Sequence, residues 1–293
     1  MIAPAKQWAI RLSKILKIFH DAHPDVNLFP INVAKVAKEY SRQLYPDEPI
    51  TLIKGDDFSD AFEGTLIPNP NKSGEWGILY NKAIKSQGRI NFTLGHEFGH
   101  YLQHRHLLSQ GVQCSRSDML KWQTSDAQIE HEANIFAANF LMPSSDFTKQ
   151  MHNKNLSKKL ITSLADRYGV SISSAALRWL ELTNNRAMIV SCKDRFIDWA
   201  WSNKNLIKSG TYYTPKQQVI EAPANSLISA NDYNESERTH KSGVWAGNEE
   251  VREILLYNKN GFALSLLLYP KDITYGNKAE DAENTEYELN FSI

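Results

Sequence analysis

The amino-acid sequence predicts an α+β protein with a mixed N-terminal domain over residues 1–184 and a β-rich C-terminal domain over residues 185–293. Helical patterns dominate the first part and give way to short strand patterns only between residues 50 and 80. From about residue 186 onward, strand patterns replace the helical ones. A chain of 293 residues also exceeds the usual size of a single core, so two domains are expected.

The elements follow in order from the spacing of apolar residues and from the turn residues between them. Helical spacing predicts helices at residues 4–22, 31–44, 86–107 and 127–141, and across most of 144–182. Apolar runs bounded by turn residues predict strands at residues 51–53, 62–67, 75–80, 187–191, 196–201, 254–257 and 262–269. The segment Asn258–Gly261 is a strong hairpin signal between the last two strands. The polar stretch 109–126 is expected to be a loop or lid, and the acidic end, 276–288, to be loosely ordered.

Composition and charge exclude several classes of protein. Lys+Arg and Asp+Glu each number 33, so the net charge is zero, unlike that of a generally basic nucleic-acid binder. The 12 Phe, 12 Tyr and 7 Trp exclude disorder as the main state. Because Cys114 and Cys192 are the only two cysteines, the chain has neither a disulfide scaffold nor a four-cysteine zinc site. Both thiols are expected to be free.

No segment has the features of a membrane span or an export signal. The most apolar stretch, Phe262–Tyr269, is far shorter than the roughly 20 residues of a spanning helix. Lysine and arginine residues interrupt the N-terminal segment, whose apolar residues follow the spacing of an amphipathic helix. We therefore expect a cytoplasmic protein without a membrane partner.

Residues 164–179 have the pattern of two helices joined by a tight turn. Gly169 is expected to form the turn, and Ser171 to cap the helix that follows. DNA-binding helix-turn-helix units share this pattern, so a DNA-binding regulator is one alternative. The zero net charge and the absence of a dense Lys/Arg stripe favour a helical hairpin packed on the preceding domain, without direct DNA binding.

The histidines carry the chemical signal of this sequence. Five of the nine fall close together, at His96, His100, His104, His106 and His131. The segment Gly95–His100 contains an H-E-x-x-H pattern, and side chains four residues apart project from one face of a helix, so both imidazoles can bind one metal ion. Zinc suits two nitrogen ligands and leaves room for a carboxylate and a water. Glu97 lies beside the pair, where it can hold that water and accept its proton.

A third ligand is needed, and three residues compete for the role. His106 has the spacing of a three-histidine pattern, but Gln103 stands where that pattern needs a glycine to leave the helix. His104 lies one turn further along the same face, too far along the axis to share one ion, so a supporting or surface role is expected. Glu132 begins a helix with an apolar face, which can bring a carboxylate to the metal from a second, packed helix.

Two segments resemble the signatures of the ImmA/IrrE family of zinc metallopeptidases. One is Gly95–His100, and the other is Glu132-Ala-Asn-Ile-Phe-Ala-Ala-Asn-Phe-Leu-Met-Pro143, in the order found in that family. The resemblance is firm over residues 85–143, extends more loosely over 30–182 and says little about 190–293. It implies a zincin-like metallopeptidase domain with a small mixed sheet, an H-E-x-x-H helix and a helical extension over about residues 144–184.

The resemblance also implies the roles of the site residues. The implied ligands of a Zn2+ ion are His96, His100 and Glu132. Glu97 would be the catalytic base, taking a proton from the zinc-bound water before the attack on a peptide carbonyl. Glu130 and His131 stay open as alternatives to Glu132, because each helical step turns the side chain by about 100° and only one of the three can face the metal squarely. Cys114 is a further alternative as a regulatory ligand, although an ordinary loop cysteine is favoured.

The implied activity is that of a zinc-dependent endopeptidase that cleaves a helix-turn-helix transcriptional repressor and so derepresses mobile-element or stress genes. The chain has no clear repressor domain of its own, so the substrate would be a separate protein. The C-terminal domain would be a sensor, a substrate-docking domain or a structural extension. The alternatives are a general degradative peptidase, a DNA-binding regulator, and a catalytically silent zinc-containing module that regulates a transcription factor. The intact Glu97 argues against the silent module.

Overall fold

The computed structural model describes residues 5–59, 62–69, 71–107, 112–115, 125–213, 218–230 and 235–270, with the side chains of 112–115 and 125–126 left out. The chain divides into two compact units. The first comprises the described residues up to Gln150 together with Leu164–Ser174, and the second comprises Met151–Ser163 and the described residues from Ala175 onward. Both units combine helices with strands, which confirms the predicted α+β class. In the described residues, no helix is both long and apolar enough to cross a membrane.

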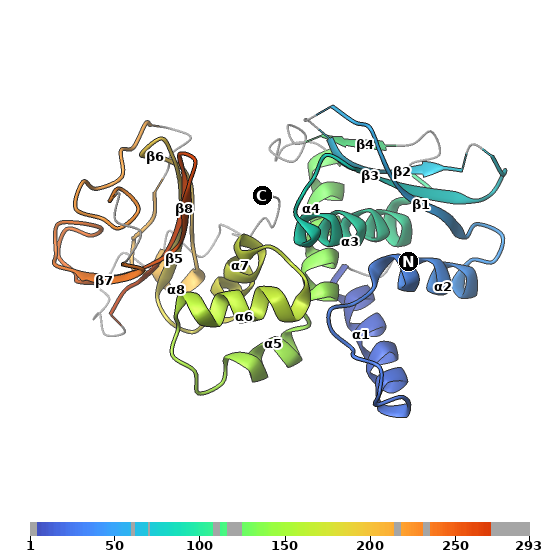
Figure 1. The fold of residues 1–293 in the computed structure, drawn as a ribbon, viewed down its shortest axis with the longest axis horizontal. Coiled ribbons are helices and arrows are strands. Elements are labelled where there is room, and N and C mark those ends of the chain that lie inside the picture. Colours follow the sequence, from blue (N-terminus) through green and yellow to red (C-terminus); the bar gives the residue numbers. More distant parts are fainter. Residues whose placement is uncertain are drawn as a thin grey trace. The chain divides into compact units, whose positions relative to one another are not determined.

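The first unit combines helices with a four-stranded mixed sheet (Figure 1). Its elements are α1 (Ala5–Ala22), α2 (Val33–Leu44), β1 (Ile50–Asp56), β2 (Phe62–Pro68), β3 (Trp76–Asn81), α3 (Gln87–His104), β4 (Val112–Ser115), α4 (Ser125–Leu141) and α5 (Ser144–Met151). The strand order is β1-β3-β2-β4, in which β1 runs parallel to β3 and the other pairs are antiparallel. The strand β4 lies within the stretch expected to be a loop. A strand of only four residues is too short to show an alternating pattern in the sequence.

Helix α3 lies beneath this sheet and packs against both β2 and α4 (Figure 1). The helix begins where the side chain of Ser86 accepts a hydrogen bond from the backbone N–H of Arg89. Phe98 of α3 meets Phe136 and Phe140 of α4 edge to face, and all three rings are fully buried. These contacts form the core between the two helices and hold them in register.

The helical region 144–182 is confirmed as α5, α6 (Lys158–Tyr168) and α7 (Ile172–Leu182). Gly169 forms the turn with a positive φ of 60°, and the hydroxyl of Ser171 caps α7 by accepting from the backbone N–H of Ser174. Helices α6 and α7 each contribute residues to both compact units. The division therefore runs through the hairpin that the sequence assigns to the N-terminal domain, and a domain boundary at 184/185 stays a prediction.

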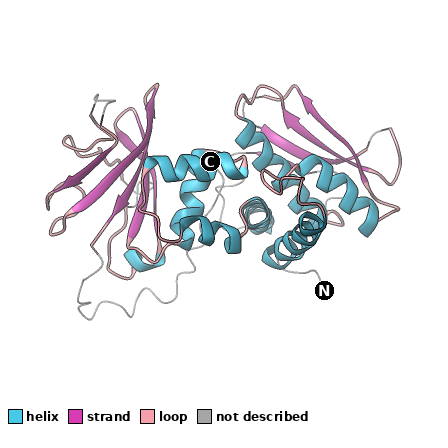
Figure 2. Cartoon of the chain, turned by 60° about the horizontal axis from the view of Figure 1, so that its bottom comes forward, coloured by secondary structure: helices cyan, strands magenta, loops and turns pink. Residues whose placement is uncertain are grey.

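The second unit is built on a five-stranded antiparallel sheet, whose strands lie side by side in Figure 2. Its elements are β5 (Ala187–Lys193), β6 (Phe196–Ser202), α8 (Lys204–Ile207), β7 (Glu237–His240), β8 (Val251–Lys259) and β9 (Phe262–Leu268), in the strand order β6-β5-β9-β8-β7. The hairpin between β8 and β9 is confirmed: Asn260 and Gly261 have φ values of 55° and 78°, as a tight two-residue turn requires. The short α8 and the polar β7 were not predicted.

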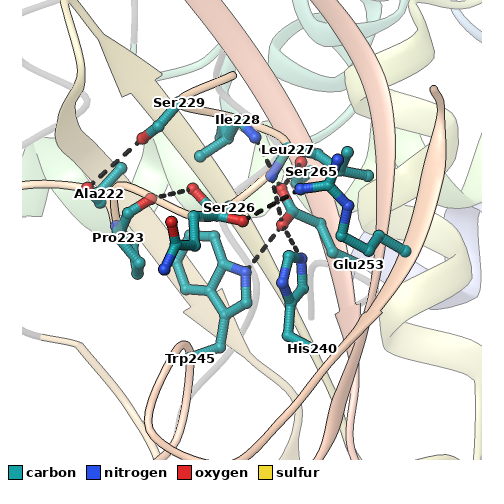
Figure 3. A network of polar contacts seen from close by, with 12 residues as sticks. Ala222, Pro223, Ser226, Leu227, Ile228, Ser229, His240, Trp245, Glu253 and Ser265 are labelled. Atoms are coloured by element: carbon teal, nitrogen blue, oxygen red, sulfur yellow. Dashed lines mark hydrogen bonds and ion pairs between the residues drawn. The ribbon is translucent and has the colours of Figure 1, made fainter. Parts of the chain in front are cut away.

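A buried carboxylate ties the elements of this sheet together (Figure 3). Glu253 of β8 is fully buried and accepts five hydrogen bonds. The donors are the backbone N–H groups of Leu227 and Ile228, Nε2 of His240, Nε1 of Trp245 and the hydroxyl of Ser265, all at 2.8 or 2.9 Å. Because every donor comes from a different strand or loop position, this one side chain connects β7, β8 and β9 with the loop at residues 226–228.

Candidate metal centre

Two glycines allow α4 to approach α3 closely at the H-E-x-x-H segment. A Cβ atom at Gly99 would lie 2.9 Å from Cδ1 of Phe136 and 3.3 Å from the Cα atom of Ala133. A Cβ atom at Gly95, one turn earlier, would lie 3.4 Å from Cβ of Ala137. The backbone of α4 therefore runs directly over the glycine side of α3, which brings the first turns of α4 within reach of the histidines.

The close packing assembles three buried ligand groups. Nε2 of His96 and Nε2 of His100 lie 2.9 Å apart. The carboxylate of Glu130 spans the pair, with Oε2 at 3.1 Å from the first nitrogen and Oε1 at 3.2 Å from the second. In the part of the chain that the structure describes, this is the one group of three His, Cys, Asp or Glu residues placed to hold a metal ion. Two imidazoles and one carboxylate, all buried, form a donor set that suits zinc.

Glu132, which the resemblance implies as the third ligand, does not lie with the histidine pair. Its Oε2 atom lies 3.0 Å from Nε2 of His104, and its Oε1 accepts a hydrogen bond from the side chain of Gln128. Two steps along a helix turn the side chain by about 200°, so Glu130 and Glu132 point to different sides of α4. Glu130, left open as an alternative, lies beside the imidazoles instead, and the role of Glu132 as a ligand stays a prediction of the resemblance.

The other sequence candidates fall outside the cluster. α3 continues through Gln103, whose side-chain amide donates to the backbone oxygen of Gly99, and His106 is exposed after the helix has ended. His104 is buried, and its Nδ1 atom lies 3.1 Å from Nδ1 of His100. His131 is not part of the cluster. Cys114 lies in β4, whose side chains are outside the described part of the chain, so its role as a ligand stays a prediction.

Each histidine of the pair has a partner on its second ring nitrogen. Nδ1 of His96 lies 2.8 Å from Oδ1 of Asn134, and Nδ1 of His100 lies 3.1 Å from Nδ1 of His104. The Nε2 atoms are thereby left for the centre of the cluster. Sequence reasoning missed Asn134, although its spacing of four residues from Glu130 is a signal that both lie on one face of α4.

Residues 49–180 match the family model described as the IrrE N-terminal-like domain, which is classed with the peptidases. These residues form an IrrE N-terminal-like domain. The match includes both signature segments and the cluster of His96, His100 and Glu130, and it confirms the resemblance predicted from the sequence. The match to this family supports a function either as a metallopeptidase or as an IrrE-like regulator.

A solved structure shares the fold of most of the chain. It belongs to a protein from Mycobacterium tuberculosis named a transcriptional regulator, with 12% sequence identity and a TM-score of 0.56. The match covers 90% of this chain and 76% of that chain. At this identity the likeness shows a shared fold. No curated protein matches the sequence.

Glu97 of the IrrE-like domain occupies a buried position next to the ligand cluster. It is 1% exposed, and its Oε2 atom has no hydrogen-bond partner among the described residues. Gly64 brings β2 close to this side chain, since a Cβ atom there would lie 3.3 Å from Oε1 of Glu97. Burial raises the pKa of Glu97 to about 8, against the lowering effect of His96. The unpaired Oε2 atom is the position at which this side chain can hold a water molecule and accept its proton.

The charges within the cluster are strongly coupled. Burial by itself lowers the pKa of His96, but the hydrogen bond and negative charge of Glu130 raise it to about 9. Burial lowers the pKa of His100 to about 4. For Glu130, burial raises the pKa, yet the hydrogen bonds from both histidines lower it well below its usual range. Glu130 is thus a carboxylate held in its charged form, which is the form that binds a cation.

Proposed function

We propose that this protein is a zinc-dependent endopeptidase whose metal is held by His96, His100 and Glu130 and whose catalytic base is Glu97. The observation that carries the proposal is the unpaired oxygen of Glu97, buried beside a buried cluster of two imidazoles and one carboxylate. Among the described residues the cluster has three ligand groups, whereas a structural zinc site would need a fourth protein ligand. Three ligands and a carboxylate that can act as a base are the arrangement that hydrolysis needs.

The chain's own groups supply the proton transfers of peptide hydrolysis. A zinc ion bound at this cluster would act as a Lewis acid toward the peptide carbonyl and would acidify a water molecule. The carboxylate of Glu97 accepts a proton from the attacking water while the water oxygen bonds to the carbonyl carbon. When the C–N bond breaks, the same carboxyl group returns the proton to the leaving nitrogen.

We propose that the substrate is a helix-turn-helix transcriptional repressor, cleaved to derepress mobile-element or stress genes. Support comes from the match of residues 49–180 to the IrrE N-terminal-like domain, together with the ImmA/IrrE signatures of the sequence. The rival function, direct DNA binding by α6 and α7, needs an exposed recognition helix. Residues 173–180 of α7 are all buried, which disfavours that rival.

The test is cleavage of repressors encoded beside the gene for this protein, monitored by mass spectrometry with the full chain and added zinc. Casein serves as an unrelated, unfolded substrate. We expect one repressor to be cut at a defined bond, while Glu97→Gln binds zinc but leaves the repressor intact. Cleavage of casein at many bonds, without preference for a repressor, would instead identify a degradative peptidase. If no substrate is cut by the zinc-loaded chain, the endopeptidase proposal fails.

A further inference from the structure

We propose that His104 and Glu132 form a positioning pair that orients His100 for metal binding, with Glu132 acting through His104 and never touching the metal. The proposal rests on the proposed metal site of His96, His100 and Glu130, and it assigns a role to a carboxylate and an imidazole that lie outside that site. Three contacts in a row carry it: His100 to His104, His104 to Glu132, and Glu132 to Gln128.

The protons in this row can be assigned from the contacts alone. When Nε2 of His100 offers its lone pair to a metal ion, its single proton must be on Nδ1, which lies 3.1 Å from Nδ1 of His104. His104 can accept that proton's hydrogen bond only if its own proton is on Nε2. That nitrogen lies 3.0 Å from Oε2 of Glu132, an acceptor. The row therefore has one consistent direction, from the ligand to the carboxylate.

Glu132 selects the tautomer on which this direction depends. Without its carboxylate, the proton of His104 could move to Nδ1, and two N–H groups would then face each other across 3.1 Å. His104 is 4% exposed, so no bulk water can replace the lost acceptor for His100. The side chain of Glu132 is 36% exposed and reaches His104 from the edge of the buried cluster.

The geometry of the two helices places both members of the pair. His100 and His104 lie one turn apart on α3, so their rings are neighbours, with centroids 5.2 Å apart. Glu132 reaches His104 from α4 and lies on a different side of that helix from Glu130. Asn134 holds the other ligand, His96, in the same manner. Partners of this kind fix the tautomer and ring orientation of a ligand, and their loss costs about 10- to 100-fold in metal affinity.

The test is the zinc dissociation constant of the full chain, measured by competition with a chromogenic chelator. We expect Glu132→Ala and His104→Phe each to weaken zinc binding at least about tenfold. Glu132→Gln, which keeps an acceptor oxygen, should recover most of the affinity. His106→Ala is the matched control, because it removes an exposed histidine two residues further on and should leave zinc binding unchanged.

A second readout separates positioning from a general loss of structure. Long-range proton–nitrogen NMR spectra of the zinc-loaded chain report which ring nitrogen carries the proton. We expect His104 to carry it on Nε2 in the wild-type chain and to populate the other tautomer in Glu132→Ala. Glu132→Ala replaces a partly exposed side chain, so the fold should persist if the His104→Phe variant does not fold.

The outcomes distinguish this inference from the proposed function. If Glu130→Gln loses zinc while Glu132→Ala and His104→Phe bind it as tightly as the wild type, the positioning pair is overturned and the metal site stands. If Glu132→Ala loses zinc as completely as Glu130→Gln, Glu132 is a direct ligand and the inference is equally overturned. If the wild-type chain binds no zinc, the metal site fails, and the proposed function fails with it.

Discussion

Asn134 of α4 accepts a 2.8 Å hydrogen bond from Nδ1 of His96, one helical turn after Glu130 reaches the same ring through Nε2. One face of α4 thus supplies both a carboxylate for the centre of the cluster and an amide for the outer side of one imidazole. Because the amide oxygen can only accept, it holds the proton of His96 on Nδ1 and leaves Nε2 as the ligand atom.

Replacing Asn134 should therefore weaken metal binding without removing a ligand. We expect Asn134→Leu to raise the zinc dissociation constant about tenfold, because the ring of His96 loses the partner that fixes its tautomer. Isothermal titration calorimetry of the full chain measures this change. Asn139→Leu is the control: Asn139 lies on the same helix, but its amide donates to the backbone oxygen of Ile135. Equal zinc affinity in both variants would contradict the assigned role of Asn134.

The substitution Glu97→Gln should separate catalysis from metal binding. Its buried carboxylate lies beside the cluster but is not one of the three ligand groups. We expect the turnover number for repressor cleavage to fall about 10²- to 10⁴-fold, as is typical when a general base is lost. Metal content, measured by mass spectrometry, should stay at the wild-type level. A variant that retained activity would show that another group accepts the proton.

The substitution Gly99→Ala should destabilise the first unit. Its methyl group would lie 2.9 Å from the ring of Phe136 and 3.3 Å from the backbone of Ala133, so α4 must move away from α3. We expect a loss of about 1 to 3 kcal/mol in the free energy of unfolding, together with weaker zinc binding as Glu130 withdraws. Thermal unfolding checks the first effect and chelator competition the second.

A matched control for this prediction is Gly247→Ala. A Cβ atom at Gly247 has nothing within 4 Å, so the added methyl group meets no neighbour. Its effect on the free energy of unfolding should stay within about 0.5 kcal/mol. If Gly99→Ala were as harmless as this control, the close approach of α4 to α3 would not depend on the glycine.

The helix pattern of the sequence predicted α3 and α4 well because apolar spacing depends on local neighbours. The choice between Glu130 and Glu132 depends on how α4 is rotated about its own axis, and that rotation is decided by a partner far away in the sequence. Here Ala133 and Ala137 meet Gly99 and Gly95, which turns the face of Glu130 toward the histidines. A search for small residues on facing helices would have favoured Glu130.

Two of the elements that escaped prediction, β7 and α8, have only four residues each. The strand β7 has the sequence Glu-Arg-Thr-His and pairs with β8 at the edge of the sheet. The four-residue helix α8 is held by the side chain of Asn203, which accepts from the backbone N–H of Leu206. Neither has enough apolar residues to show a period, so their positions follow from tertiary contacts such as that between His240 and Glu253.

The stability of the second unit should fall in acid because of Glu253. Burial raises the pKa of its carboxyl group, but the hydrogen bonds from His240, Trp245, the Leu227 backbone and Ser265 outweigh this and lower the pKa below the usual value. The ordinary pKa of a glutamate in an unfolded chain is about 4.3. Because the pKa of Glu253 is lower in the folded state, its carboxylate contributes stability that is fully present at pH values above the pKa of the unfolded chain. This contribution is lost as the pH falls from about 4.3 through the folded pKa.

The substitution Glu253→Gln should remove this acid-sensitive contribution. In the wild type, five donors share the two oxygens of the Glu253 carboxylate, whereas an amide is uncharged and has only one oxygen. We therefore expect the unit to lose about 3 kcal/mol of stability at neutral pH. The variant should also show a smaller further loss of stability between about pH 5 and pH 3 than the wild type.

Hydrogen exchange over β8 and β9, with the metal chelated, measures both effects in this unit alone. Glu250→Gln, at an exposed position nearby, should change stability by less than about 0.5 kcal/mol. If the two variants had equal exchange rates, the buried carboxylate would contribute no net stability, because its desolvation would cancel its five hydrogen bonds.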